Sequence, residues 1–180
     1  GRTEWMKLYG VLFGTEEEAD LVFEKQEQAF LEVNPDELEN KSVVIFYISP
    51  KGNLHVRNAD DYMTKMFELA GGEYVFSDLN PGETGTEVME MEAFYERAKD
   101  AEYIIYMYNM GGRPETLADF LSYNELLSDF KAVEKNNVWC TTPEFFQLSH
   151  SLGEMIKEFN EVLKLEDESQ DQFNYLFKLK

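Results

Sequence analysis

Hydrophobic runs and amphipathic segments alternate along most of the chain. Residues 42–48 and 103–108 are continuous apolar runs rich in β-branched and aromatic residues, which predict strands buried on both faces. Residues 137–140 predict a third, shorter strand, and apolar residues recur at helical spacing within residues 60–70 and 89–98. This alternation predicts an α/β fold: a three-layer, Rossmann-like domain with a mostly parallel central sheet.

The two ends of the chain have patterns of their own. Residues 4–33 have helical periodicity but are interrupted at Gly14, so we expect a long helical opening in two pieces. A last helix is expected to begin at Pro143 and to continue to residue 165. Residues 173–180 alternate apolar and polar positions, which predicts a strand at a sheet edge.

Composition and charge narrow the classes of function. The 180 residues suit a single domain, and 36 acidic against 16 basic residues give a formal net charge of −20. Such a charge excludes broad binding to nucleic acid, which requires the opposite sign, and argues against docking on an anionic membrane. The single cysteine, Cys140, excludes an internal disulfide.

Catalytic and metal-binding motifs are missing from the sequence. It contains no phosphate-binding loop and no nucleophile elbow, and Gly71-Gly72 follows a helix rather than a strand. His55 and His150 lie far apart, without the spacing of metal ligands. Cys140 follows residues expected to be buried, which favours a place in the core. We therefore expect no enzymatic activity, no metal site and no bound cofactor.

Topology gives better support for a binding role. In an open α/β sheet, ligands bind beyond the carboxyl ends of the strands, where residues 49–57, 108–116 and 141–147 form the loops here. The candidate ligand-binding residues in or next to these loops are His55, Arg57, Tyr108, Asn109, Arg113, Trp139, Phe145 and Gln147.

Each of these candidates also has a structural alternative. Arg57 and Arg113 suit bidentate contacts to an anionic ligand, but either arginine could instead pair with a neighbouring carboxylate. Trp139 on a short strand fits the core as well as a ligand platform, and His55 fits a solvated turn.

Residues 77–89, rich in Gly, Pro and Asn, are predicted to form a loop.

Several motifs together carry a family resemblance. They are Glu4-Trp5-Met6-Lys7-Leu8-Tyr9-Gly10, Glu68-Leu69-Ala70-Gly71-Gly72, Asp100-Ala101-Glu102-Tyr103-Ile104-Ile105-Tyr106 and Asn137-Val138-Trp139-Cys140. In this order they resemble the C-terminal half of the iron-siderophore, haem and cobalamin class of ABC-importer substrate-binding proteins, class III of the periplasmic binding proteins. The family joins two α/β lobes by one long, rigid helix and holds its ligand between them.

The resemblance implies a division of the chain. Residues 1–34 correspond to the connecting helix, residues 35–165 to the second lobe, and residues 166–180 to a tail with an edge strand. On this interpretation the N-terminal lobe is missing from the chain, and a signal peptide and lipid-accepting cysteine precede residue 1 in an extracytoplasmic, membrane-anchored lipoprotein.

The resemblance also implies a function and partners. We expect a binding component that captures a ferric siderophore, haem or a corrinoid such as cobalamin and delivers it to an ABC permease. Family members dock on the permease through an acidic residue near a helix start, and Glu92 matches best here, with Glu90 and Glu87 competing. These glutamates could equally serve only the positive helix N-terminus.

A second function stays open at this point. The same fold could serve as a stand-alone sensory or protein-interaction lobe without a ligand in its cleft. In either case the face that would meet another lobe is left exposed, and exposed aromatic surface favours association. We therefore expect the isolated lobe to self-associate through this face or through the C-terminal strand.

Overall fold

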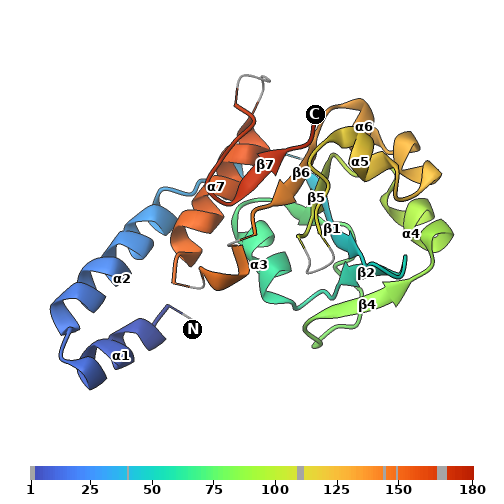
Figure 1. The fold of residues 1–180 in the computed structure, drawn as a ribbon. Helices are drawn as coiled ribbons and strands as arrows, with labels where there is room; N and C mark the ends of the chain where they lie inside the picture. Colours follow the sequence, from blue (N-terminus) through green and yellow to red (C-terminus); the bar gives the residue numbers. More distant parts are fainter. Residues whose placement is uncertain (1–2, 40, 109–111, 144, 149, 166–169) are drawn as a thin grey trace.

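A single mixed sheet organises the protein. In the computed structural model, which describes residues 3–39, 41–108, 112–143, 145–148, 150–165 and 170–180, the described residues form one sheet of seven strands (Figure 1). The strands are β1 (Ser42–Ile48), β2 (Leu54–Arg57), β3 (Glu73–Tyr74), β4 (Thr86–Met89), β5 (Tyr103–Tyr106), β6 (Val138–Thr141) and β7 (Leu176–Lys178). Their order is β4-β2-β1-β5-β6-β7, and β3 pairs with the beginning of β1.

The centre of the sheet is parallel and its flanks are antiparallel. β1 pairs in parallel with β5, and β5 in parallel with β6. β2 and β4 add antiparallel strands at one side, and β7 adds another beside β6. The α/β class is thus confirmed, but the sheet contains more antiparallel pairs than we expected. β2 follows β1 through a short turn that reverses the chain, β4 returns to pair with β2 after α3 and β3, and β7 adds the antiparallel strand at the other side.

Helices cover both faces of the sheet and complete three layers. The helices of the lobe are α3 (Tyr62–Leu69), α4 (Met91–Ala98), α5 (Leu117–Leu121), α6 (Lys131–Glu134) and α7 (Leu152–Lys164). On one face the Phe67 ring of α3 stacks on Phe159 of α7 at 4.0 Å. On the other face Phe46 of β1 packs against Phe94 of α4 and Phe120 of α5. Figure 1 shows these two helix layers on opposite sides of the sheet.

The opening of the chain forms an arm that projects from the lobe (Figure 1). It consists of α1 (Trp5–Phe13) and α2 (Glu16–Leu31), which pack against each other. The interruption predicted at Gly14 is confirmed, since this residue ends α1 with φ of 68°. The two pieces expected in this opening are thus present, and the chain turns back between them at Gly14. The assignment of residues 1–34 to a connecting helix between two lobes stays a prediction.

The arm meets the lobe at one close helix crossing. Gly153 of α7 lies so near α2 that a Cβ atom there would come within 1.9 Å of the Gln26 carbonyl oxygen. Next to this contact the Gln26 side chain donates to Glu154 Oε2 at 2.8 Å, and its oxygen accepts from the Glu154 backbone N–H at 3.1 Å. Ion pairs such as Lys25–Glu154 surround the crossing. Polar contacts and a glycine therefore fix the arm on the lobe.

Two segments differ from the sequence expectations. Residues 86–89, predicted to be part of a loop, form the edge strand β4, because their backbone pairs with β2 although Glu87 and Val88 are exposed. The last helix begins at Leu152 instead of Pro143, after the 3₁₀ turn Phe145–Gln147. None of the described helices is long and apolar enough to cross a membrane.

Candidate functional site

The candidate site lies where the parallel strands β1, β5 and β6 end. We call this region the carboxyl face, defined by Tyr47, His55, Arg57, Met107, Tyr108, Thr141, Thr142 and Phe146, of which Met107, Thr141 and Thr142 are buried. β2 runs antiparallel to β1 and places His55 directly opposite Tyr47, so β2 also contributes to this end of the sheet. The topology therefore brings together residues from all three loops that the sequence identified.

Arg57 reaches this face but is tightly engaged. Its Nη1 pairs with Asp61 Oδ2 at 3.3 Å, its Nε donates to the Met107 sulfur at 2.9 Å, and its side chain is only 13% exposed. Asp61 is itself occupied, since it accepts from the backbone N–H groups of Met63 and Gly85 and begins α3. The alternative that Arg57 pairs with a neighbouring carboxylate is the one the structure shows.

Aromatic rings form the accessible part of the face. The ring of His55 lies parallel to that of Tyr47, with centroids 4.6 Å apart, and both residues are partly exposed. Phe146 is 40% exposed, and the Arg57 guanidinium lies 5.8 Å from the centre of its ring. Flat, partly solvated rings of this kind suit stacking on a planar or apolar ligand.

The remaining polar candidates occupy different settings. Tyr108 is partly buried, and its backbone N–H donates to Thr141 Oγ1 at 2.8 Å, which ties the ends of β5 and β6 together. Arg113 lies with its guanidinium 4.8 Å from the centre of the Phe177 ring of β7. Gln147 is exposed, and Asn109 lies outside the described residues.

Trp139 and Phe145 belong to the core. They are 1% and 2% exposed, Trp139 packs on Phe173, and Phe145 stacks on Phe159 of α7. The structure contradicts their prediction as ligand-binding residues, because Trp139 lies on β6, an interior strand of the sheet, and Phe145 lies in the following 3₁₀ turn with its ring packed on α7. Cys140 is buried as well, and burial raises the pKa of its thiol to about 12, which leaves it unreactive.

Tyr47 and Phe146 are residues of the candidate site that the sequence analysis did not identify. Tyr47 belongs to a run expected to be buried on both faces, but it is the one partly exposed residue between buried Phe46 and Ile48. Phe146 follows Phe145, and only the local turn decides which ring is buried. The pairing of Tyr47 with His55 across a tight hairpin was the available signal, since residues 49–53 form the predicted turn.

The glutamates expected to dock on a permease lie together at one corner. Glu90 precedes the first residue of α4 without capping it through its side chain, and Glu92 lies in the first turn; both are exposed. They border a hollow of about 270 Å³ whose other walls come from the β1–β2 hairpin, from the end of β4 and the start of α4, and from Tyr123 and Asn124. Glu87, on β4, instead accepts a hydrogen bond from Asn80 at 3.2 Å.

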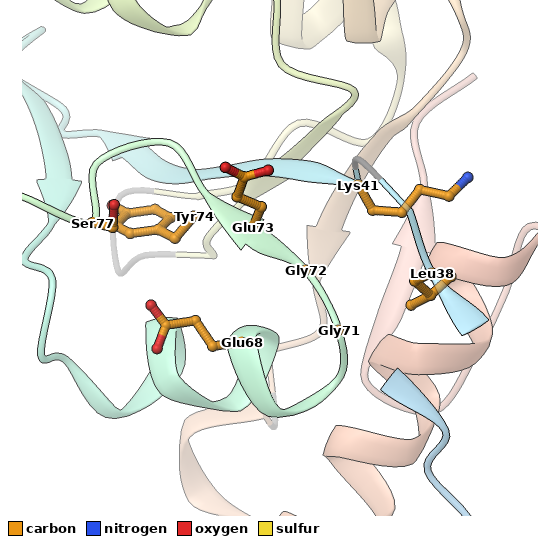
Figure 2. Close-up of a pocket in the computed structure, with 8 residues that line it drawn as sticks. All are labelled: Leu38, Lys41, Glu68, Gly71, Gly72, Glu73, Tyr74 and Ser77. Carbon is orange, nitrogen blue, oxygen red and sulfur yellow. The ribbon is translucent and has the colours of Figure 1, made fainter. Parts of the chain in front are cut away.

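A larger hollow of about 390 Å³ lies at the opposite, amino end of β1 (Figure 2). Glu68, Glu73 and Lys41 border it, and Figure 2 shows the Lys41 ammonium group pointing away from both carboxylates. Glu68 is already paired with Lys65 at 3.0 Å. Within the described residues no three His, Cys, Asp or Glu side chains converge as metal ligands. The carboxyl face is therefore the better candidate for ligand binding.

Comparison with known proteins agrees with this architecture. A lipoprotein of Methanocaldococcus jannaschii, MJ0878, is 32% identical over 151 residues, which cover 82% of this chain but 35% of that protein. The chain therefore spans about a third of this relative's length.

Two solved structures share the fold. An ABC-type Fe3+-hydroxamate transport system protein from Saccharomonospora viridis aligns with TM-score 0.70 and 17% identity, covering 91% of this chain and 55% of that one. The periplasmic haem-binding protein HutB of Vibrio cholerae aligns with TM-score 0.68 and 15% identity, covering 87% and 60%.

A match to a protein family decides the assignment. The sequence model of the family described as periplasmic binding protein matches residues 1–145, which is most of the chain. Proteins of this family are binding components of transport systems rather than enzymes, in agreement with the expectation from the sequence. The arrangement of arm, mixed sheet and carboxyl face, together with this match, shows that the chain belongs to the periplasmic binding protein family.

Proposed function

We propose that this chain is the second lobe of an extracytoplasmic substrate-binding protein that delivers an iron chelate, haem or a corrinoid to an ABC permease. The observation that carries the proposal is the carboxyl face, which presents the Tyr47–His55 stack and, near Arg57, the exposed Phe146 ring on the fold of a binding-protein family. The two structural neighbours, an Fe3+-hydroxamate transport system protein and a haem-binding protein, support this class of ligand.

The proposal includes a first lobe outside this chain. It would cover the carboxyl face and the apolar side of α1, where Trp5, Leu12 and Phe13 are exposed. The name of the methanogen relative, a lipoprotein, supports a membrane-anchored, extracytoplasmic location. The ligand would then lie between two surfaces, of which this chain supplies one.

The ligand part of the proposal is tested in the complete binding protein with a ferric trihydroxamate and haemin as separate probes. Phe146→Ala and Tyr47→Ala should each weaken binding of the accepted probe about fivefold, because each removes one stacking surface. Phe30→Ala on the arm is the control and should leave affinity unchanged. Unchanged affinity in both face variants would remove the carboxyl face from the site.

The permease part is tested by reversing one charge. A projecting carboxylate can pair with a permease arginine and fix orientation, so Glu92→Arg should abolish ligand uptake by cells while the purified protein keeps its affinity. Glu96→Arg, an exposed position on the same helix, is the matched control. Normal uptake with Glu92→Arg would favour Glu90 as the docking residue or a lobe without a permease partner.

A further inference from the structure

The C-terminal segment makes a tight turn beside the carboxyl face. The turn, residues 173–176, is closed by the Phe173 N–H, which donates to the Leu176 carbonyl oxygen at 2.9 Å. Leu176 pairs with Thr141, the last residue of β6, and the Tyr175 carbonyl oxygen accepts from the Thr142 N–H at 2.9 Å. The turn therefore lies at the carboxyl end of β6, next to residues of the candidate site.

A buried carboxylate holds this turn in place. Glu158 of α7 is 4% exposed, and its Oε2 accepts from the Asn174 N–H at 3.0 Å. Its Oε1 accepts from the N–H groups of Tyr175 at 2.7 Å and Leu176 at 2.9 Å. Three consecutive backbone donors thus converge on one side chain, which satisfies a group that is costly to bury unpaired.

The same hydrogen bonds continue into the carboxyl face. Thr142 Oγ1 donates to the Asn174 carbonyl oxygen at 3.4 Å. The neighbouring Thr141 Oγ1 accepts from the Tyr108 N–H at 2.8 Å. A continuous set of contacts therefore links Glu158 through the turn to the ends of β6 and β5.

We propose that residues 173–176 form a further wall of the ligand site, with Asn174 as a ligand-contacting residue and Glu158 as its positioning residue. The ligand-contacting part rests on the proposed function. Asn174 is exposed, and its amide offers an uncharged donor and acceptor suited to the carbonyl and hydroxyl oxygens of an oxygen-rich chelate. Glu158 does not touch ligand and acts only through the turn.

The positioning role is tested by amide hydrogen exchange in this chain. Glu158→Gln replaces an acceptor oxygen by a donor, so the amides of residues 174–176 should exchange at least about tenfold faster, while those of β1 and β5 keep their protection. Glu161→Gln, exposed on the same helix, is the matched control. Unchanged exchange at residues 174–176 in Glu158→Gln overturns the positioning role. If that variant does not fold, amide exchange in the wild-type protein is the test. Exchange of the turn amides as fast as in an unstructured peptide overturns the positioning role of Glu158. Protection of these amides comparable to that of β6 supports the role.

The ligand contact is tested with a fluorophore attached at Asn174→Cys in the complete binding protein. Native Cys140 is buried with a raised thiol pKa and does not compete for the label. Ser128→Cys, exposed next to the helices on the opposite face of the sheet, is the control. A ferric trihydroxamate and haemin are the probes, and equilibrium dialysis measures their binding independently.

The outcomes separate the inference from the proposed function. A saturable change in fluorescence at position 174, without one at 128, supports Asn174 as a ligand contact. Binding by dialysis with no change at 174 overturns the contact and leaves the proposed function standing. If neither probe binds, the ligand class of the proposed function is overturned, and the proposed contact between Asn174 and the ligand is overturned as well. The hydrogen-exchange experiment still decides the role of Glu158 in that case.

Discussion

The lobe and the arm bury their apolar residues in opposite ways. In the lobe, Phe46, Ile104 and Phe94 are completely buried between the sheet and its helices. In the arm, Phe13 is 76% exposed, Leu12 and Leu31 are also exposed, and only Gly10, Ala19 and Gln26 are buried in α1 and α2. The lobe therefore supplies its own core, whereas the arm presents a hydrophobic surface that no described part of this chain covers.

This difference indicates what each region does. A fully packed sheet and two helix layers can hold loops in fixed positions, which a binding face requires. An amphipathic helix pair with its apolar side in solvent is typical of a surface that meets another part of a protein. The arm depends on the polar contacts around Gly153 for its position, and the lobe does not depend on the arm for its core.

The largest expected effect comes from exchanging one aromatic ring for alanine in each region. Phe46→Ala should lower the free energy of unfolding by about 3–5 kcal/mol, since it removes a ring that contacts Phe94, Tyr106 and Phe120. Phe13→Ala should change it by less than about 0.5 kcal/mol, because that ring is in solvent. Urea denaturation of both variants measures this, and equal losses would show that the arm contributes to the core.

The next effect is a pH dependence confined to the lobe. Burial outweighs the three backbone donors and raises the pKa of Glu158 to about 7, from 4.5 in the unfolded chain. A group whose pKa is higher in the folded state stabilises it at low pH, and that contribution is lost as pH rises through about 7. The unfolding free energy, relative to Glu158→Gln, should fall by up to about 3 kcal/mol between pH 4.5 and 8.

Urea denaturation at several pH values, performed on wild type and Glu158→Gln in parallel, measures this difference. The comparison cancels the general repulsion of a chain of net charge −20, which acts on both proteins. A difference between the two proteins that stays constant with pH would contradict the raised pKa and would place the carboxylate form in the folded protein throughout.

The smallest effect on stability belongs to the surface of the arm. Leu12→Ser together with Phe13→Ser should leave the unfolding free energy within about 0.5 kcal/mol of wild type, since both side chains are exposed. Self-association of the isolated chain should nevertheless weaken several-fold, because apolar patches drive such contacts. Sedimentation velocity at increasing protein concentration tests this, and a strictly monomeric wild type would refute it.

Much of the fold follows from local sequence pattern. The strand at residues 42–48 and the C-terminal strand are found where hydrophobic runs and alternation placed them. β4 could not be predicted because its exposed Glu87 and Val88 give no alternation, and only pairing with β2 makes it a strand. The reversal of α1 on α2 also depends on tertiary contact, since Gly10 must accept the Ala19 side chain closely.

The site was predicted less completely than the fold. Topology correctly brought the three loops together, because parallel strands end at the same edge of the sheet. The sequence could not show that Asp61, four residues beyond Arg57, would capture that arginine while also beginning α3. Nor could it place residues 173–176 at the carboxyl end of β6, since Glu158, which joins α7 to this turn, has the sequence pattern of any other helical glutamate.

Gly153, at the crossing of α7 with α2, is the point where the position of the arm relative to the lobe is fixed, so a small rotation there moves the far end of the arm by a larger distance. About ten residues, or roughly 15 Å of helix, separate Gln26 from the start of α2, so a tilt of about 10° at Gly153 would move that end by about 3 Å. A methyl group at position 153 would clash with the Gln26 carbonyl oxygen and push α2 away from α7 at this crossing. The position of α1 relative to the sheet is thus set by the absence of a single carbon atom in the lobe.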